Sequence, residues 1–327
     1  MTVTRNLLAL MFVALLAFAF VACGDDDDAV DAGNAGDASP TAAASSGEFP
    51  ITLERSDGAD LTLEAPVERI VSLSPGATEI IYAVGAEDAL IAVDNNANFP
   101  AEVAALSGRV DAYQPNVETI AGFEPDLVIV ANNIDGIVEA LDRLDIPVWY
   151  VDLDTDVKTI DDVLTQIDVL GQITGHKDAS DALLADLNER IDAVKDELSS
   201  AEPAPEAPSV YHELDGELYS IADDTFIGSL YALLGARNIA GDGGGIAYPQ
   251  LTQEAIIDGN PDVIVLADEA FGVTIDSVQA RPGWDAVAAV QNERIYAINP
   301  DIISRPGPRI VDALEQLARD LYPQVFE

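Results

Sequence analysis

The chain of 327 residues has a single cysteine, Cys23, and little positive charge. A lone cysteine leaves no partner for an internal disulfide. Lysine and arginine together number 15 against 59 aspartate and glutamate residues, which gives a formal net charge of −44. This balance argues against nucleic acid and anionic membrane surfaces as partners. The acidity fits either a high-salt habitat or a need for solubility, and it need not describe the ligand.

Signatures of catalysis and of metal binding are also missing. There is no Gly-x-Ser-x-Gly elbow, no Gly-x-x-x-x-Gly-Lys phosphate loop and no His-Glu-x-x-His pair. The two isolated histidines, His176 and His212, cannot supply a histidine-rich metal site. A pairing of Ser72 or Ser74 with His212 is conceivable in space, but no motif supports it. We therefore predict a protein that is not an enzyme and that holds no metal or cofactor.

The chain begins with the features of an export signal. Arg5 precedes an apolar run over residues 7–22, which is slightly short for a membrane span. Small residues before Cys23 resemble a bacterial lipoprotein cleavage site, although Phe20 stands where such sites usually have leucine. The sequence thus predicts a signal peptide over residues 1–22 and lipidation of Cys23. A plain signal peptide, or an anchor helix with an incidental cysteine, is the alternative.

The segment that follows the cysteine has the composition of a tether. Residues 23–48 are rich in Asp, Ala, Ser and Gly and cannot build a core, so we expect a lipidated, disordered linker. Together with the export signal, this predicts a protein of the cell envelope. It would lie on the outer face of the cytoplasmic membrane or in the periplasm, held there by a lipid anchor only.

A long helical stretch divides the rest of the chain. In residues 159–200, apolar residues recur three and four positions apart, which is the period of an amphipathic helix. Gly171 and Gly175 interrupt the pattern, and Asp178 is a candidate cap for a second segment. On either side, short β-branched runs alternate with helical patterns. The sequence therefore predicts two α/β lobes, residues 49–158 and residues 201–327, joined by a connecting helix.

The two lobes share a repeated motif, NVETIAGFEPDLVIV from Asn116 and TQEAIIDGNPDVIVL from Thr252. Each copy has a glutamate two positions on, Glu118 or Glu254, then Pro-Asp and an all-apolar run typical of a buried parallel strand. We expect about four strands in the sheet of the first lobe. Ligand sites in such sheets lie beyond the carboxyl ends of the strands, so a cleft between the lobes is the expected site.

Aromatic and basic side chains occur at the strand-to-helix turns. Tyr113 and Tyr248 precede the repeated motifs, and Tyr219 follows the strand that opens the second lobe. Arg305 stands between the last strand and the last helix, and Asp301 lies four residues before it. Rings with polar tips and a forked donor suit a large, flat, partly polar ligand. These five residues form the candidate ligand-binding set, with ordinary packing or a helix-capping ion pair as the alternative for each.

From residue 49 to its end, the chain resembles the cobalamin and iron-siderophore class of substrate-binding proteins of ABC importers. The stretches that carry the resemblance are RIVSLSPGATEIIYAVGA, NVETIAGFEPDLVIV, LGQITG, YPQLTQEAII and SRPGPRIVDALEQLA, in the expected order. The resemblance implies an α/β fold of two Rossmann-like lobes with parallel sheets. It further implies that a single long helix bridges the lobes, that the ligand cleft lies between them, and that hinge motion is small.

The resemblance also implies roles for individual residues. Glu118 and Glu254 match the lobe-tip glutamates that dock on arginines of the permease. Tyr219, Tyr248 and Arg305 match ligand contacts of the cobalamin binders. Tyr113 lies near, not on, an aromatic position of that pattern.

Three hypotheses about function follow. In the first, a lipid-anchored monomer binds a corrinoid such as cobalamin, a ferric siderophore or haem, and delivers it to the permease dimer of an ABC importer. In the second, the same scaffold serves as an extracellular enzyme or metallochaperone, for which the sequence offers no catalytic dyad. In the third, it is a sensor domain that feeds a signalling receptor. A cleft of aromatic residues and an arginine suits all three ligands of the first hypothesis.

Overall fold

The structure, a computed structural model, describes residues 48–326. All of these residues fall within one unit, Ala43–Glu327. The expected signal peptide, the lipidation site Cys23 and nearly all of the expected tether lie outside the described residues. Within residues 48–326, no helix combines the length and the apolar character needed to cross a membrane.

The first lobe contains a five-stranded parallel sheet, in the order β5-β4-β3-β6-β7, and a separate antiparallel hairpin of β1 and β2. The sequence predicts about four strands, one too few, because β5 is only two residues long and leaves no readable period. The elements are β1 (Ile51–Glu54), β2 (Asp60–Leu63), β3 (Ile70–Leu73), α1 (Pro75–Ala83), η1 (Glu87–Ala89), β4 (Leu90–Asp94), η2 (Ala101–Ala105), β5 (Arg109–Val110), α2 (Val117–Ala121), β6 (Leu127–Val130), η3 (Ile134–Gly136), α3 (Ile137–Asp142) and β7 (Val148–Tyr150).

The second lobe contains a four-stranded parallel sheet in the order β11-β10-β8-β9. Its elements are β8 (Ser209–Glu213), α6 (Phe226–Leu233), β9 (Arg237–Asn238), α7 (Gln253–Gly259), β10 (Val263–Leu266), η4 (Glu269–Phe271), α8 (Ile275–Gln279), η5 (Trp284–Ala286), α9 (Ala288–Gln291), β11 (Ile295–Ala297), α10 (Pro300–Ile303) and α11 (Ile310–Leu321). Both sheets are parallel and alternate with helices along the chain, which confirms the predicted α/β class.

The repeated motif has the same structure in both lobes. Asn116 caps α2 and Thr252 caps α7, each accepting a backbone N–H from the first turn of its helix, at 2.7 Å and 3.1 Å. After the proline, the side chain of Asp126 accepts the N–H of Glu68, two residues before β3, at 3.2 Å. In the same way, Asp262 accepts the N–H of Ser209, the first residue of β8, at 2.8 Å. The all-apolar runs that follow, β6 and β10, are buried at every position. The two lobes are therefore built alike around their central strands.

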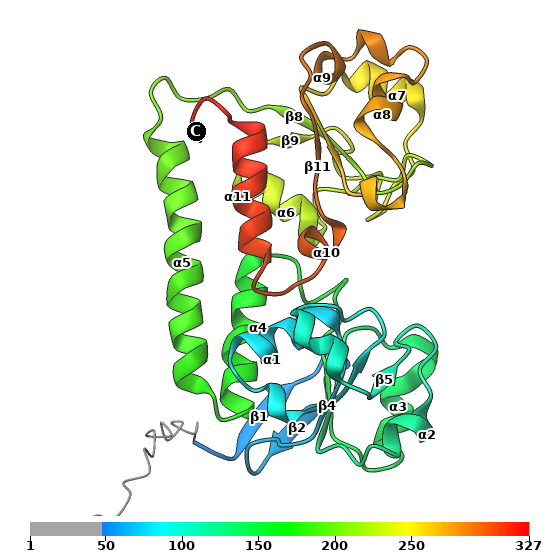
Figure 1. The fold of residues 1–327 in the computed structure, drawn as a ribbon, viewed down its shortest axis with the longest axis vertical. Coiled ribbons are helices and arrows are strands. Elements are labelled where there is room, and N and C mark those ends of the chain that lie inside the picture. Colours follow the sequence, from blue (N-terminus) through cyan, green and yellow to red (C-terminus); the bar gives the residue numbers. More distant parts are fainter. Residues whose placement is uncertain (1–47, 327) are drawn as a thin grey trace, which may run out of the picture. The chain divides into compact units, whose positions relative to one another are not determined.

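The connector consists of two helices, which corrects the expectation of a single long helix over residues 159–200. After α4 (Ile160–Ile173), the chain turns at Gly175, whose φ of +75° suits a residue without a Cβ, and continues as α5 (Lys177–Ser200). The expected cap, Asp178, lies in the first turn of α5 instead. α4 packs against α1 of the first lobe and α6 of the second, while α5 packs along α4 and reaches α11 (Figure 1).

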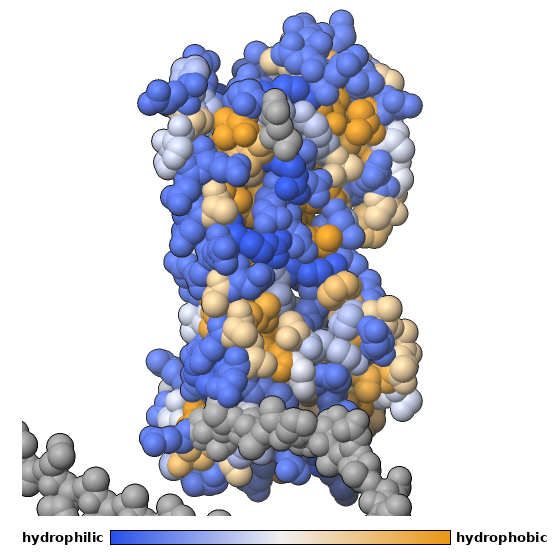
Figure 2. Space-filling model, turned by 60° about the vertical axis from the view of Figure 1, so that its left-hand side comes forward, coloured by the Kyte–Doolittle hydropathy of each residue, from blue (hydrophilic) through white to orange (hydrophobic). Residues whose placement is uncertain are grey.

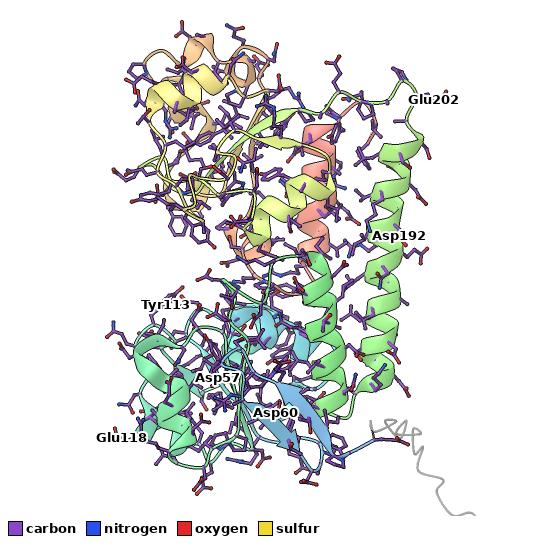
Figure 3. All side chains as sticks on the ribbon, turned by 180° about the vertical axis from the view of Figure 1, so that it is seen from behind. Asp57, Asp60, Tyr113, Glu118, Asp192 and Glu202 are labelled. Atoms are coloured by element: carbon purple, nitrogen blue, oxygen red, sulfur yellow. The ribbon has the colours of Figure 1, made fainter. Side chains whose placement is uncertain are left out.

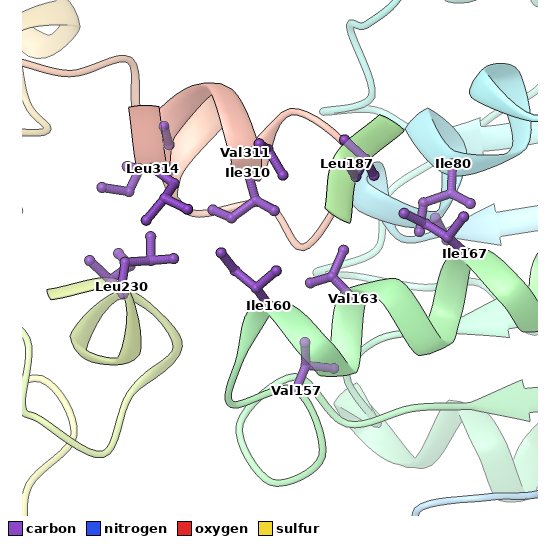
Figure 4. Packing of buried hydrophobic residues seen from close by; sticks show 14 of the residues in the cluster. Ile80, Val157, Ile160, Val163, Ile167, Leu187, Leu230, Ile310, Val311 and Leu314 are labelled. Atoms are coloured by element: carbon purple, nitrogen blue, oxygen red, sulfur yellow. The ribbon is translucent and has the colours of Figure 1, made fainter. Parts of the chain in front are cut away.

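One hydrophobic cluster runs through the connector into both lobes. Figure 4 shows Ile160 and Val163 of α4 between Leu230 of α6, Ile310 of α11 and, further along the helix, Ile80 of α1. All five side chains are at most 3% exposed, and burial of each stabilises the fold by about 1.5–3 kcal/mol. A large hinge motion would have to open this cluster, which gives a physical reason for the small hinge motion that the resemblance implies.

Candidate functional site

A cleft lies where the carboxyl ends of the first lobe's strands meet the loop before α11. Its cavity has a volume of about 340 Å³ and is lined by Ser74 after β3, Asp94 at the end of β4 and Asn132 after β6. Asp301 of α10 and Arg305 line it from the second lobe. Because parallel α/β sheets bind ligands at the carboxyl ends of their strands, this cavity is the candidate ligand site.

Of the larger hollows among the described residues, two lie away from these strand ends. One, of about 950 Å³, is formed by the proline-rich loop after α5, the last residues of the chain, and Asp262 and Arg294 just before β10 and β11. The other, of about 560 Å³, lies between the hairpin and α4. Neither contains the turns that follow β3, β4 and β6. A further hollow, of about 680 Å³, follows β10 and β11 and shares Phe271, Pro300 and Asp301 with the cavity. Strand topology, rather than volume, therefore assigns the ligand site to the strand ends, where these two hollows adjoin.

Arg305 bridges the two lobes beside this cavity. Its guanidinium donates to Asn98 Oδ1 at 2.7 Å, to the Asn96 carbonyl at 3.1 Å and to Asp301 Oδ1 at 2.6 Å. Asn98 donates in turn from Nδ2 to Asp301 Oδ2 at 2.8 Å. The Arg305 side chain is 13% exposed, so these bonds replace most of its contact with water.

A second arginine from the same loop forms a buried ion pair next to Arg305. Arg309 binds both carboxylate oxygens of Glu79 on α1, at 2.8 Å and 2.5 Å, and the Glu79 side chain is 2% exposed. The Arg309 guanidinium also lies 4.0 Å from the ring centroid of Phe99. Removing one partner of such a buried pair costs roughly 3–5 kcal/mol. Arg309 is therefore a structural link, whereas Arg305 lines the cavity.

Two exposed aromatic side chains line the cavity from opposite lobes. Tyr113, on the turn between β5 and α2, is 68% exposed and lies at the edge of the first lobe nearest the second (Figure 3). Phe271, at the end of η4, is 79% exposed. The sequence does not single out Phe271, because an isolated phenylalanine forms no motif. Its position shortly after the predicted strand over residues 263–266 is the signal that could have identified it.

Tyr219 and Tyr248 lie outside the lining of this cavity. They are 38% and 47% exposed, and Tyr219 forms an isolated antiparallel bridge with Gln250. Burial raises the pKa of Tyr248, and the nearby carboxylate of Asp154 in the first lobe raises that pKa further. Tyr248 of the second lobe therefore lies close enough to Asp154 of the first lobe for the two side chains to interact electrostatically. Of the five predicted ligand contacts, the cavity brings together Tyr113, Asp301 and Arg305.

Glu118 and Glu254 occupy equivalent exposed positions in the two lobes. Each lies in the first turn of its capped helix, α2 or α7, where a carboxylate also stabilises the helix by about 0.3–1 kcal/mol. In Figure 1 both helices lie on the side of their lobes away from α5, and Figure 3 shows Glu118 at the outer edge of the first lobe. Both carboxylates are accessible to a partner on that side.

The serine–histidine pairing considered from the sequence does not form in the described residues. His212 is fully buried, its Nδ1 lies 2.8 Å from the hydroxyl of Tyr231, and burial lowers its pKa to about 3. Ser72 donates to the Ser74 carbonyl and accepts from Thr78. Between residues 48 and 326, no group of three or more His, Cys, Asp or Glu residues is placed to hold a metal ion.

Comparison with known proteins places this geometry in a family. Residues 70–302 match the Periplasmic binding protein family. The uncharacterised ABC transporter substrate-binding lipoprotein YvrC of Bacillus subtilis is 31% identical over 282 residues, covering 85% of this chain and 88% of that protein. A cobalamin-binding protein of Halobacterium salinarum is 31% identical over 283 residues, covering 83% of this chain and 73% of that protein.

A solved structure supports the same relationship. The crystal structure of the periplasmic vitamin B12 binding protein BtuF of Vibrio cholerae matches with a TM-score of 0.68 at 30% sequence identity, over 79% of this chain and 98% of that one. The family match extends from the first strand of the first lobe's sheet to α10, and the relatives cover the two lobes and the connector between them. The chain therefore belongs to the periplasmic binding protein family.

Proposed function

We propose that this protein is the substrate-binding component of an ABC importer and that it captures a corrinoid, a ferric siderophore or haem outside the cytoplasmic membrane. The observation that carries the proposal is the cleft at the strand ends, which Asp301 and Arg305 complete from the opposite lobe. Two of the similar proteins are named for binding cobalamin or vitamin B12, which supports a corrinoid as the first choice.

Capture uses apolar and polar contacts from both lobes. The exposed rings of Tyr113 and Phe271 gain most when a flat ligand covers them, because their apolar surface is in water in the empty protein. Tyr219 and Tyr248 extend this surface beyond the cavity, and Asp301 and Arg305 orient polar groups of the ligand. A corrinoid is larger than the 340 Å³ cavity, so it spans the lobes and keeps part of its surface in solvent.

Delivery uses Glu118 and Glu254. Two equivalent carboxylates, one on each lobe, suit two equivalent cationic sites on a permease dimer, and such complementarity sets register more than affinity. Lipidation of Cys23 holds the monomer at the outer face of the membrane, close to that permease.

Uptake of labelled cyanocobalamin tests this proposal. A strain that lacks the protein but keeps the permease is complemented with the wild-type chain or with Glu118→Lys/Glu254→Lys. The wild type should restore uptake. The double variant should not, because like charges repel at both docking sites, while its ligand affinity and melting temperature stay near wild type.

The matched control is Asp60→Lys/Asp192→Lys, which makes the same charge change at exposed positions on β2 and α5 (Figure 3). This control should support normal uptake. Normal uptake by the docking variant, or equal loss in the control, would contradict the assignment of the two glutamates. Failure of the wild type to restore uptake would contradict the proposed function.

A further inference from the structure

Asp268 joins the sheet of the second lobe to a wall of the cleft. It follows β10 and is buried, and its carbonyl accepts the Phe271 N–H at 2.8 Å, which closes the turn of η4. The next four residues, 269–272, are all exposed. Phe271 lines the ligand cavity and the hollow that adjoins it. Asp268 is therefore the buried attachment point of an exposed segment whose aromatic ring lines the cleft.

The side chain of Asp268 lies in a cluster of buried polar groups. Glu213 ends β8, is buried as well, and binds Arg281 through both carboxylate oxygens, at 2.6 Å and 2.5 Å. Arg281, which follows α8, and Tyr211 of β8 are the other titratable groups that interact with Asp268. Within the described residues, the two oxygens of Asp268 and the Tyr211 hydroxyl have no hydrogen-bond partner. The cluster thus contains two carboxyl groups and one cation, and that cation is already paired.

A proton on Asp268 satisfies this cluster. The protonated acid is a hydrogen-bond donor, and the Glu213 carboxylate next to it is the acceptor. Burial, and then the charge of Glu213, raises the pKa of Asp268 to about 7, so the group is neutral below that pH and ionised above it. Once ionised, it is a second buried carboxylate beside a single arginine. A buried charge without a partner of its own is strongly disfavoured.

The ionised side chain can reach water by a movement of η4. The sheet itself is fixed up to the residue before Asp268, because the Ala267 N–H binds the Glu213 carbonyl at 2.9 Å. Beyond Asp268, four exposed residues bury little surface, so little opposes a displacement of this segment. We therefore expect release of the proton to displace η4, and Phe271 with it.

We propose that Asp268 is a positioning residue for the cleft: its proton keeps η4 against the sheet and Phe271 in the cavity wall, and loss of that proton weakens ligand binding. This rests on the proposed function, because it needs a ligand that covers Phe271. Linkage makes the effect reciprocal, so ligand binding favours the protonated form and takes up protons near pH 7. The protein therefore binds its ligand more tightly below pH 7 than above it.

Fluorescence of Trp284 tests the cluster in the ligand-free protein. The Arg281 guanidinium lies 4.6 Å from the centroid of the Trp284 ring, so this tryptophan reports on the pairing of Arg281. The chain has two tryptophans, and Trp149→Phe leaves Trp284 as the single reporter. In that background, the emission should change between about pH 6 and pH 8 with a midpoint near 7. Asp268→Asn should remove this transition, because its neutral amide can donate to Glu213 at every pH.

Asp320→Asn is the matched control for the loss of one carboxyl group. Asp320, on α11, also has a pKa that burial raises, but it lies near Tyr231 rather than in this cluster. The control should keep the transition. An emission that does not change with pH, or the same transition in Asp268→Asn, would overturn the proposal.

Titration calorimetry at pH 6 and at pH 8.5 tests the link to binding. The probe is cyanocobalamin, or haemin or ferrioxamine B where only one of these binds. The affinity of the wild type should be lower at pH 8.5 by about fivefold or more. Asp268→Asn should lose most of this difference, and Asp320→Asn should keep it. The comparison between variants removes the contribution of Asp94, which lines the cavity and whose own pKa burial raises.

Phe271→Ala shows whether the proton acts through the ring. This variant should bind the probe more weakly at pH 6 and should show the small pH difference of Asp268→Asn, because the group that the proton positions is gone. A Phe271→Ala variant that keeps the full pH difference of the wild type would overturn the role given to Asp268.

The two proposals fail differently. A wild type that binds none of the three probes at either pH would contradict the proposed function. A wild type that binds a probe equally well at both pH values would leave the binding-protein assignment in place and would overturn the positioning role of Asp268.

Discussion

Asp268 carries its carboxyl group in surroundings that disfavour a charge. It is 0% exposed, neither side-chain oxygen has a hydrogen-bond partner, and it lies beside Glu213, which is paired with Arg281 at 2.6 Å and 2.5 Å. Burial, and then the charge of Glu213, raises the pKa of Asp268 to about 7. The folded protein thus keeps a proton that the unfolded chain releases near pH 4. We predict that the free energy of unfolding falls as pH rises from about 4 to about 7.

Denaturant unfolding of the wild type and of Asp268→Asn at several pH values measures this contribution. The asparagine is neutral throughout, so the variant should lose less stability than the wild type over that range. Subtracting the two curves removes the effect of other groups that titrate there, such as Asp94 and Asp320, whose pKa values burial also raises. If the free energy of unfolding changed with pH by the same amount in the wild type and in Asp268→Asn, the role given to Asp268 would be wrong.

Tyr248 and Arg305 should differ in how they link binding to stability. The ring of Tyr248 is 47% exposed, so Tyr248→Ala should weaken corrinoid binding by roughly 1–4 kcal/mol and leave the melting temperature nearly unchanged. Arg305→Ala should lower both the affinity for the corrinoid and the melting temperature, because it also removes the bonds to Asn98 and the Asn96 carbonyl across the lobes. Titration calorimetry and thermal unfolding separate the two effects. Leu144→Ala, at an exposed site that lines none of the hollows described, is the control.

A large loss of stability with unchanged affinity in Tyr248→Ala would make that tyrosine a packing residue and would move the ligand contacts elsewhere.

At the scale of elements, Gly171 allows α4 and α5 to pack closely. A Cβ at this position would overlap the Cβ and Oγ of Ser180 on α5. We predict that Gly171→Ala lowers the free energy of unfolding by about 1–3 kcal/mol. Adding Ser180→Gly should recover part of this loss, because it reopens the space. A Cβ at Gly122, the matched control, would come no closer than 3.3 Å to any atom, so Gly122→Ala should cost much less. A Gly171→Ala variant as stable as the wild type would contradict this packing.

The sequence predicts an element well when residues at its ends, such as proline or glycine, show where it begins or stops. The strands over residues 127–130 and 263–266 occur where the sequence predicts them, since Pro-Asp and an apolar run define both. β5 and β9 have two residues each, and their pairing partners determine them rather than any pattern of their own. The connector is similar: Gly175 marks the break in the sequence, but the packing of α5 back along α4 is a tertiary contact.

The candidate site follows the same rule. Asp301 and Arg305 are predictable from their place between the last strand and the last helix. Asn98 is not, because its bonds to Asp301 and Arg305 cross the cleft and no local pattern encodes them. Phe271 forms no motif, and only its place shortly after a predicted strand points to it.

At the scale of the whole molecule, the net charge of −44 works against the folded state. Hydrophilic residues cover much of the face shown in Figure 2, and acidic residues outnumber basic ones about fourfold in the sequence. Repulsion between like charges destabilises a compact protein, and salt screens it beyond about 10 Å at 0.1 M. We predict that the melting temperature and the free energy of unfolding rise as KCl is raised from about 0.1 M to about 1 M. If the melting temperature and the free energy of unfolding stay constant or fall as KCl is raised, the net charge does not destabilise the folded state.

Titration calorimetry of the protein with cyanocobalamin tests the ligand cleft most directly. The wild type should form a one-to-one complex, and Arg305→Ala should weaken that complex by at least about tenfold, since in the proposed complex Arg305 would bind a polar group of the ligand. Leu144→Ala should bind as the wild type does. A wild type that gives no binding signal with cyanocobalamin, or an Arg305→Ala variant that binds it unchanged, would contradict a corrinoid in this cleft.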